Sequence, residues 1–315
     1  SDWSSDVCSS DLEPDGFDRF NRVSNTANVL LNVMFILMAL VCIIPVLLVI
    51  AISLSAEASI TEYGYHLIPK IISFEGYEYL AKQSTLIIRA LGISLFVTIV
   101  GTVLGILLTT LMGYVLSRPG YKLNGFLTMV VFIPMVFNGG LVSTYFITSQ
   151  FLNLKDSVWA LILPLAVSSF NVVICRTFFK TTVPEELIES AKMDGARQFT
   201  IFFRIVLPIS LPVLATIGLF LCFAYWNDWY QSMLYIDDQR LYSLQALLNA
   251  IMTNVNMLAQ NAAAMGASMA DTVANMPKEA ARMAIVVVIV LPIACAYPFF
   301  QKYFISGLTV GAVKG

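Results

Sequence analysis

The side chains most capable of chemistry are concentrated in one stretch, positions 184 to 208, which reads PEELIESAKMDGARQFTIFFRIVLP. Its acidic residues are Glu185, Glu186, Glu189 and Asp194, in a chain of which only 12% of residues are charged. Carboxylates can act as general acids and bases or as docking groups for a partner. We expect the protein to act through this stretch.

Catalytic motifs are missing from the rest of the sequence. There is no GxxxxGK[ST] phosphate loop, no HExxH and no GxSxG. The five cysteines stand singly, without metal-ligand or CxxC spacing, and no basic run favours nucleic acid. We therefore predict no catalytic residue, no metal and no cofactor. The apolar windows also hold no carboxylate cluster, which argues against a proton-coupled carrier or a membrane-embedded hydrolase.

The local pattern around the acidic residues predicts a short helix. Thr182 and Glu185 have the spacing of a capping box, with Pro184 in the first turn. The helix should run to about Asp194 and stop at Gly195, which can adopt a left-handed conformation. Leu187, Ile188 and Ala191 are predicted to share an apolar face, with Glu186, Glu189 and Lys192 pointing elsewhere.

An aromatic run formed by Phe199, Phe202 and Phe203 follows this helix and leads back into apolar sequence. The segment therefore predicts a helix, a turn and a second helix that present acidic and small residues. Such a connector suits docking to a soluble partner. The alternative is an interfacial helix on the inner leaflet, but three Glu before any Lys fit poorly with an anionic membrane surface.

The composition indicates that the elements positioning this connector lie in lipid. Hydrophobic residues make up 58% of the 315, and the mean hydropathy is +0.80. The predicted fold class is an all-α membrane protein with six transmembrane helices, several of them kinked by proline. The six apolar windows are roughly Val29 to Leu54, Ile93 to Leu116, Phe126 to Ile147, Val158 to Phe179, Leu207 to Tyr225 and Ile285 to Phe304.

The distribution of the 18 Lys and Arg residues predicts an orientation. With both termini in the cytoplasm, the cytoplasmic set is the larger one and lies close to helix ends. It comprises Arg19, Arg22, Arg118, Lys122, Arg176, Lys180, Lys192, Arg197, Arg204, Lys302 and Lys314. Residues 1–16 are predicted to be a disordered or non-native leader, and residues 17–315 the membrane domain.

Two further patterns concern packing outside the connector. Gly101 and Gly105 form a GxxxG, for which we favour close packing within the bundle over a dimer interface. The outer segment 230–282 contains an apolar run, Leu241 to Val255, at helical spacing. This run predicts an amphipathic helix that either lies along the outer surface, docks an external partner or packs on the bundle.

The acidic stretch also carries a family motif. Glu189, Ser190, Ala191, Gly195 and the IVLP at 205–208 resemble the EAA motif, EAAxxxG followed nine residues later by IxLP, of inner-membrane permeases of binding-protein-dependent ABC importers. Ser190 stands where the motif has its first Ala. The segments FNGGLVSTYF, WALILP and the C-terminal YPFFQKYFISGLTVGAVKG resemble the maltose-type carbohydrate permeases, most closely the branch associated with aldouronate and complex oligosaccharides.

The resemblance implies a type I ABC importer permease fold in a bacterial cytoplasmic membrane. The chain would be a transporter subunit and no enzyme. It would pair with a homologous second permease, an ABC ATPase dimer and an extracytoplasmic sugar-binding lipoprotein. Residues 183–204 would form the coupling helix region, and the residues implied to contact the ATPase are Glu185, Glu186, Glu189, Ser190, Ala191, Asp194, Gly195 and Ala196.

Two other sites follow from the same resemblance. The tail 306–315, with Gly307, Gly311, Lys314 and Gly315, resembles family tails that reach into the ATPase dimer; the alternative is a frayed terminus. Polar or aromatic residues that could line a sugar pathway are Asn138, Asn171, Tyr225, Trp226 and Asn227. Hydrogen bonding between helices and interfacial anchoring explain these five equally well, and we favour that interpretation.

Two alternative functions remain open from sequence. The same architecture could import a different solute, such as an amino acid, a peptide or phosphate. A stand-alone channel or secondary carrier belongs to another class, and activity of the single chain without ATP would favour it. Neither inverted-repeat symmetry nor buried charge supports the second alternative.

Overall fold

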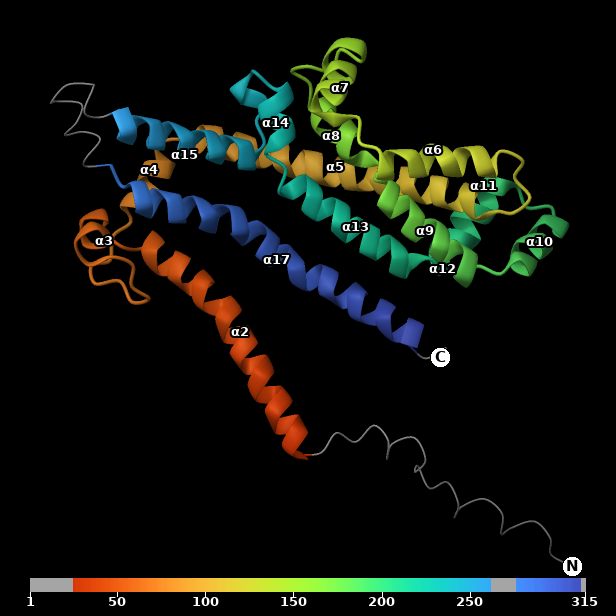
Figure 1. The fold of residues 1–315 in the computed structure, drawn as a ribbon, viewed down its shortest axis with the longest axis horizontal. Helices are drawn as coiled ribbons and strands as arrows, with labels where there is room; N and C mark the ends of the chain where they lie inside the picture. The colour runs from red at the N-terminus through yellow and green to blue at the C-terminus, as the bar shows by residue number, and fades with distance from the viewer. Residues whose placement is uncertain (1–24, 262–275, 313–315) are drawn as a thin grey trace, which may run out of the picture.

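The chain folds into a helical bundle, shown in Figure 1. A computed structural model describes residues 25–261 and 276–312, and the leader predicted at 1–16 lies outside them. Within the described residues the secondary structure is helical, apart from one isolated bridge between Ser55 and Ile72. The all-α prediction is therefore confirmed for this part of the chain.

Two of the predicted spans are single continuous helices. Helix α2 (Asn25–Ser53) has 29 residues and α5 (Ser84–Ser117) has 34. At 1.5 Å per residue they are about 44 and 51 Å long, which exceeds the hydrocarbon thickness of a bilayer. Pro45 lies inside α2 without ending it. Both helices are long and apolar enough to cross a membrane.

Two other predicted spans are bent. Helix α8 (Val158–Ala166) meets α9 (Ser169–Thr182) at 47°. The segment Gln198–Ile209 meets α13 (Leu211–Trp226) at 83°, so the fifth window does not begin a straight span at Leu207 as predicted. Pro212 lacks the N–H that would bond the carbonyl four residues earlier, and a new helix therefore starts in a new direction after Ser210.

The third window, Phe126 to Ile147, is not one helix. Helix α6 (Asn124–Val136) has only 13 residues, and α7 (Gly140–Phe146) turns steeply away from it (Figure 1). Gly140 has φ +81° at the break, and Asn138 Oδ1 accepts a hydrogen bond from its amide at 2.9 Å. The sixth window lies inside α17 (Lys278–Ala312), a helix of 35 residues. A count of six spans is therefore not established by the described residues.

Helix α5 is the centre of the bundle, and α8, α9 and α13 pack along it. The glycines of the GxxxG make these contacts possible. A Cβ at Gly101 would lie 2.5 Å from Cζ of Tyr225, and one at Gly105 would lie 2.8 Å from the carbonyl oxygen of Ala166. The prediction that this motif packs within the bundle is confirmed.

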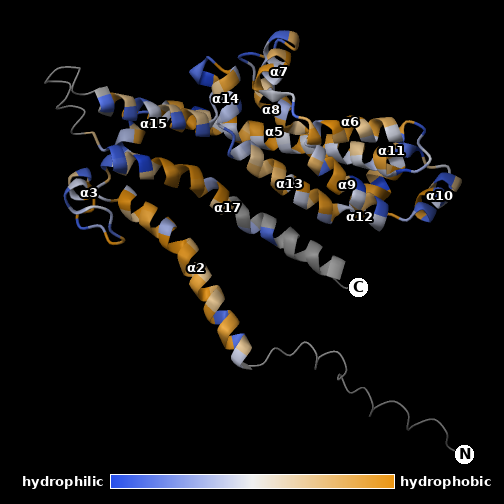
Figure 2. Ribbon diagram, in the orientation of Figure 1, coloured by the Kyte–Doolittle hydropathy of each residue, from blue (hydrophilic) through white to orange (hydrophobic). Residues whose placement is uncertain are grey.

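Helix α2 stands apart from that centre. Its apolar side chains between Val29 and Ile50 are largely exposed, and Figure 2 shows hydrophobic residues along most of its length. It contacts α17, and Ile52 at its end packs with Ile60 and Ala280. This helix therefore presents a long apolar surface to its surroundings.

The end of the bundle where α2 finishes is closed by short elements. The Glu57 carboxylate accepts hydrogen bonds from the amides of Glu279 and Ala280 at 3.0–3.1 Å, which caps the start of α17. The run predicted at Leu241 to Val255 forms α15, whose apolar face packs against α5 and α17, as the bundle-packing alternative predicted. The short elements at this end (Figure 1) are α3 (Glu57–Tyr63) and α4 (Glu75–Ala81), whereas α14 (Tyr230–Tyr235) and η3 (Gln239–Leu241) precede the 18-residue α15 (Leu244–Asn261).

Candidate docking site

The predicted short helix is present as α10 (Glu185–Met193), at the opposite end of the bundle from α3 and α4 (Figure 1). The capping box is wrong. Thr182 is the last residue of α9 and Pro184 precedes α10 without a side-chain cap, because α9 runs further than predicted and a helical residue cannot cap the next helix. Glu185 and Glu186 in the first turn interact favourably with the helix dipole.

The end of α10 is as predicted. Gly195 has φ +80°, its amide donates to the carbonyl of Lys192, and the amide of Ala196 donates to the carbonyl of Ala191, both at 3.0 Å. These two bonds form a Schellman motif, which satisfies the last carbonyls of the helix. The chain is thereby turned sharply into α11 (Gln198–Ile201).

Helix α10 has one face on the bundle and one in solvent. Ile188 and Ala191 are buried in the main core cluster, whereas Leu187, predicted to join them, is 37% exposed. All residues of α10 other than Ile188 and Ala191 are exposed, and four of these side chains, spaced at i, i+3, i+4 and i+7, share one helix face. This docking face consists of Glu186, Glu189, Ser190 and Met193.

Met193 is the residue on this face that the sequence analysis missed. Its side chain is 89% exposed at the end of the helix. The i, i+3, i+4, i+7 relation to Glu186 was the signal that could have identified it. The docking face thus combines two carboxylates, a hydroxyl and an apolar side chain, all exposed.

Of the other residues predicted to contact the partner, Glu185 and Asp194 are exposed, and Ala196 is half-buried beside the turn. Ala191 lies on the bundle side at 7% exposure, so its small side chain lets α10 approach its own core. The Ser190 hydroxyl donates a hydrogen bond to the carbonyl of Leu187 at 3.0 Å, so its hydrogen is used within α10 itself.

An aromatic cluster connects the docking helix to the bundle. The residues after α11 form the π-helical turn η2 (Phe202–Val206) and α12 (Leu207–Ile209). The Phe202 ring lies 5.3 Å from the Tyr114 ring of α5, and Tyr114 lies 6.1 Å edge-on from Phe179 of α9. Ile188 and Ala191 of α10 belong to the same core cluster as these rings, so a displacement of α10 would disturb the packing of α5 and α9.

The five candidate pathway residues are not gathered around a common cavity among those described. The Tyr225 hydroxyl donates to the carbonyl of Ile162 at 2.7 Å, and the Trp226 indole donates to the carbonyl of Ile289 at 3.3 Å. Both side chains are buried, which agrees with the favoured role in helix packing. Asn171 is buried in α9, while Asn138 and Asn227 are exposed.

The C-terminal tail is described only in part. Gly307 and Gly311 lie in the last turns of α17, whereas Lys314 and Gly315 lie outside the described residues. The described part of the chain also contains no group of three or more His, Cys, Asp or Glu residues that could hold a metal. Fold and site together define a helical membrane protein in which the short helix α10 exposes acidic side chains at one end of the bundle.

The family follows from comparison with known proteins. Residues 101–310, more than half of the chain, match the family described as binding-protein-dependent transport system inner membrane component. The chain therefore belongs to this family of transporter permease subunits, which are not enzymes.

Relatives in Bacillus subtilis (strain 168) cover nearly the whole chain. Protein LplC is 37% identical over 87% of this chain and 90% of its own length. The polygalacturonan/rhamnogalacturonan transport system permease protein YtcP is 38% identical over 89% of this chain and 96% of its own length. The arabinooligosaccharides transport system permease protein AraQ is 28% identical over 90% and 95%.

A solved structure shares the fold. It belongs to a bacterial ABC transporter involved in the import of the acidic polysaccharide alginate. The TM-score is 0.75 at 24% identity, over 88% of this chain and 96% of the other. At this identity the likeness shows the fold alone.

Proposed function

We propose that the chain is a membrane-spanning subunit of an ATP-driven importer of oligosaccharides. Family membership supplies the transport system, and the names of the relatives YtcP and AraQ supply the substrate class. A homologous second permease would complete the pathway, and an extracytoplasmic sugar-binding lipoprotein would deliver the solute. The six-span count and cytoplasmic location of both termini belong to this proposal.

The observation that carries the coupling role is the two-sided structure of α10. Ile188 and Ala191 fix the helix to the core, and the docking face is left free for a partner. We propose that an ABC ATPase dimer binds this face, with Glu189 at its centre. ATP-driven closure of the dimer would then displace α10 and, through the Tyr114–Phe202 contact, the spans above it.

The C-terminal tail is proposed as a second contact with the ATPase. Gly307 and Gly311 continue α17 toward the end of the bundle at which the tail would meet that dimer. Lys314 and Gly315 would extend the contact.

A charge reversal on the docking face tests the coupling role. Glu189→Lys replaces an exposed carboxylate, so the chain should still fold and insert, while copurification of the ATPase and ATP-driven sugar uptake should be lost. The matched control is Glu78→Lys, which makes the same exchange at an exposed site on α4 and should leave ATPase copurification intact. Retention of the ATPase and of uptake by the Glu189→Lys protein would refute the assignment.

A further inference from the structure

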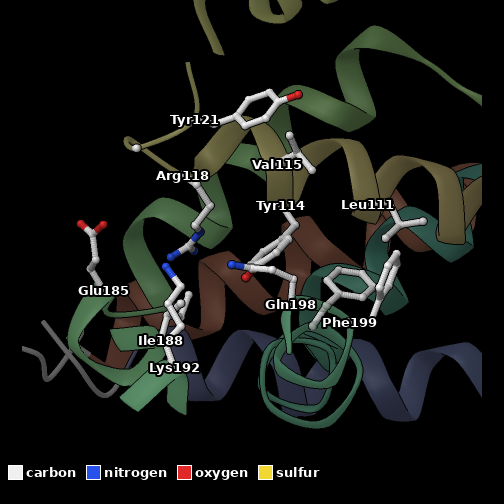
Figure 3. A pocket seen from close by; sticks show the side chains of 12 residues that line it. Leu111, Tyr114, Val115, Arg118, Tyr121, Glu185, Ile188, Lys192, Gln198 and Phe199 are labelled. Atoms are coloured by element: carbon white, nitrogen blue, oxygen red, sulfur yellow. The ribbon is translucent and has the colours of Figure 1, made fainter. Parts of the chain in front are cut away.

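A cavity of about 480 Å³ lies on the bundle side of the docking helix, bounded by the end of α5, by α10 and by α11. Its volume falls in the range of small-molecule sites. One part of its wall is polar or charged, and the other is apolar (Figure 3). The apolar part is formed by Leu111, Val115, Ile188, Phe199 and Phe202.

Two cations line this cavity. Arg118 follows α5 and Lys192 is in the last turn of α10, and Figure 3 shows their side chains reaching toward each other. Neither has a carboxylate within 4 Å among the described residues. Glu185 stands at the margin, with its carboxylate set apart from the cationic groups in Figure 3. With one carboxylate against two cations, the lining of the cavity carries a net positive charge, and Glu185 stabilises the charged form of Arg118 without pairing with it.

Arg118 is held in place without using its full hydrogen-bonding capacity. Its Nε donates to Ser117 Oγ at 3.1 Å, and the guanidinium carbon is 5.1 Å from the centre of the Tyr114 ring. Partial burial lowers the pKa of Arg118 from its usual value, and the guanidinium nevertheless stays protonated at any physiological pH. Its terminal N–H groups remain available for an anion.

A buried hydroxyl also lacks a partner. Tyr114 lines the cavity, only 7% of its side chain is exposed, and its hydroxyl makes no hydrogen bond within the described chain. The hydroxyl oxygen itself is shielded from solvent, so Tyr114 contributes its aromatic ring to the wall of the cavity and supports the Arg118 guanidinium there.

The C-terminal end of α5, which borders the cavity, does not repel an anion as an uncompensated helix C-terminus would. The carbonyl of Leu116 accepts hydrogen bonds from Arg176 Nε at 3.1 Å and from Asn124 Nδ2 at 3.2 Å. The carbonyl of Arg118 accepts another from Asn124 at 2.8 Å. The negative ends of these peptide dipoles are thus already compensated.

We propose that this cavity binds an anionic phospholipid, with the phosphate on Arg118 and Lys192 and an acyl chain along the apolar wall. Leu111 lies on α5, seven residues before Arg118, and therefore about 10 Å deeper along the helix axis. A wall that runs from cations into apolar side chains matches an amphiphile and exceeds what a free phosphate needs. Which leaflet supplies the lipid rests on the orientation proposed above, whereas binding itself does not.

The bound lipid would bridge α5 and α10 on the side of α10 opposite the docking face. The docking face points away from the cavity, because Glu185, Ile188 and Lys192 line it and Glu186, Glu189 and Met193 do not. Lipid and ATPase would therefore bind at the same time. The lipid composition of the membrane would then set how firmly α10 is seated.

Native mass spectrometry of the full-length chain, with its copurifying subunits, tests the proposal by titration with phosphatidylglycerol or phosphatidylcholine. The wild type should retain phosphatidylglycerol preferentially. Arg118→Gln combined with Lys192→Gln should weaken phosphatidylglycerol binding about 30-fold and leave phosphatidylcholine binding unchanged. Lys122→Gln combined with Lys180→Gln removes equal charge from exposed sites at the same end and should have little effect.

A milder variant keeps the test decisive if the double variant folds poorly. Lys192→Gln alone changes one exposed side chain of α10, so it should fold as the wild type does, and it should weaken phosphatidylglycerol binding about fivefold. Equal loss in the Lys122/Lys180 control, displacement of the lipid by millimolar inorganic phosphate, or loss of the lipid when the ATPase copurifies would each overturn the proposal. Sugar uptake is not the readout, so failure here is distinguishable from failure of the proposed function.

Discussion

At the scale of single residues, Gly195 has the most specific requirement. Its φ of +80° is a conformation that costs an L-residue about 1–2 kcal/mol, and more for a β-branched one. A Cβ there would meet nothing within 4 Å, so the requirement is one of backbone conformation and not of space. The direction in which the chain leaves α10 therefore depends on this residue.

Gly195→Val should misdirect that turn and reduce copurification of the ATPase at least severalfold, since it strains the Schellman motif. The matched control is Gly125→Val, an open helical position in α6 where no unusual backbone conformation is needed. Detergent pull-down measures both. Unchanged association of the Gly195→Val protein with the ATPase would show that binding does not depend on the left-handed turn after α10.

Asp228 provides a pH-dependent prediction. Burial between α13 and α14 raises the pKa of its carboxyl to about 6, although its Oδ1 accepts a hydrogen bond from the amide of Gln231 at 3.3 Å. The raised pKa means that folding favours the protonated form. Its contribution to stability is full below the unfolded pKa of about 3.9 and is lost as the pH rises through about 6.

Asp228→Asn should abolish this dependence. The stability of the variant relative to wild type should rise between pH 4.5 and 7.5, by at most about 3 kcal/mol. Thermal unfolding in detergent across this range measures the difference, and Glu78→Gln at an exposed site is the control. A difference that stays constant with pH would contradict the raised pKa.

The conformations of single residues could be predicted from sequence where they depend on neighbouring residues alone. Gly195 follows an amphipathic turn directly, so its left-handed conformation was readable. Thr182 was wrongly assigned as a helix cap, because a threonine fits both the last turn of one helix and the N-cap of the next. Only the tertiary packing of α9 decides which helix it joins. The orphan hydroxyl of Tyr114 had no sequence signal, since it depends on residues from three helices.

At the scale of elements, α17 depends on a residue far away in sequence. Glu57 caps its first turn through the amides of Glu279 and Ala280. A carboxylate at this position satisfies donors that otherwise lack partners and interacts with the helix dipole. The segment joining α2 to α5 is thus fastened to the last helix.

Glu57→Ala should lower the unfolding free energy by about 1–2 kcal/mol and the Tm by a few degrees. Hydrogen exchange should become faster at residues 279–282 and remain unchanged in α10. Glu57→Gln, which keeps an acceptor oxygen, should have a smaller effect. Unaltered exchange at the start of α17 in the alanine variant would argue that another group caps the helix.

The bends were only partly predictable. Proline marks positions where a helix loses a hydrogen bond, but Pro45 lies within a continuous α2, and α6 and α8 end only after their prolines at 134 and 164. Whether a helix continues past proline depends on neighbours that satisfy the freed carbonyl. Those neighbours are known only once the bundle is assembled.

At the scale of the whole molecule, α2 shows the limit of prediction from one chain. Its sequence is apolar on all sides, so periodicity cannot say which side faces protein and which faces lipid. The structure leaves it largely uncovered beyond its contact with α17. Class and family were readable from composition and the motif at 189–208, whereas the environment of α2 depends on molecules outside the chain.

The 83° angle at Ser210 has a mechanical consequence. Gln198–Ile209 is almost perpendicular to α13 and about 18 Å long. A lateral force on its far end would therefore exert a torque about the axis of α13. A sideways displacement of about 3 Å at the far end of that segment corresponds to a rotation of α13 of about 10° about its own axis. A straight connection would transmit a push along the axis but no torque.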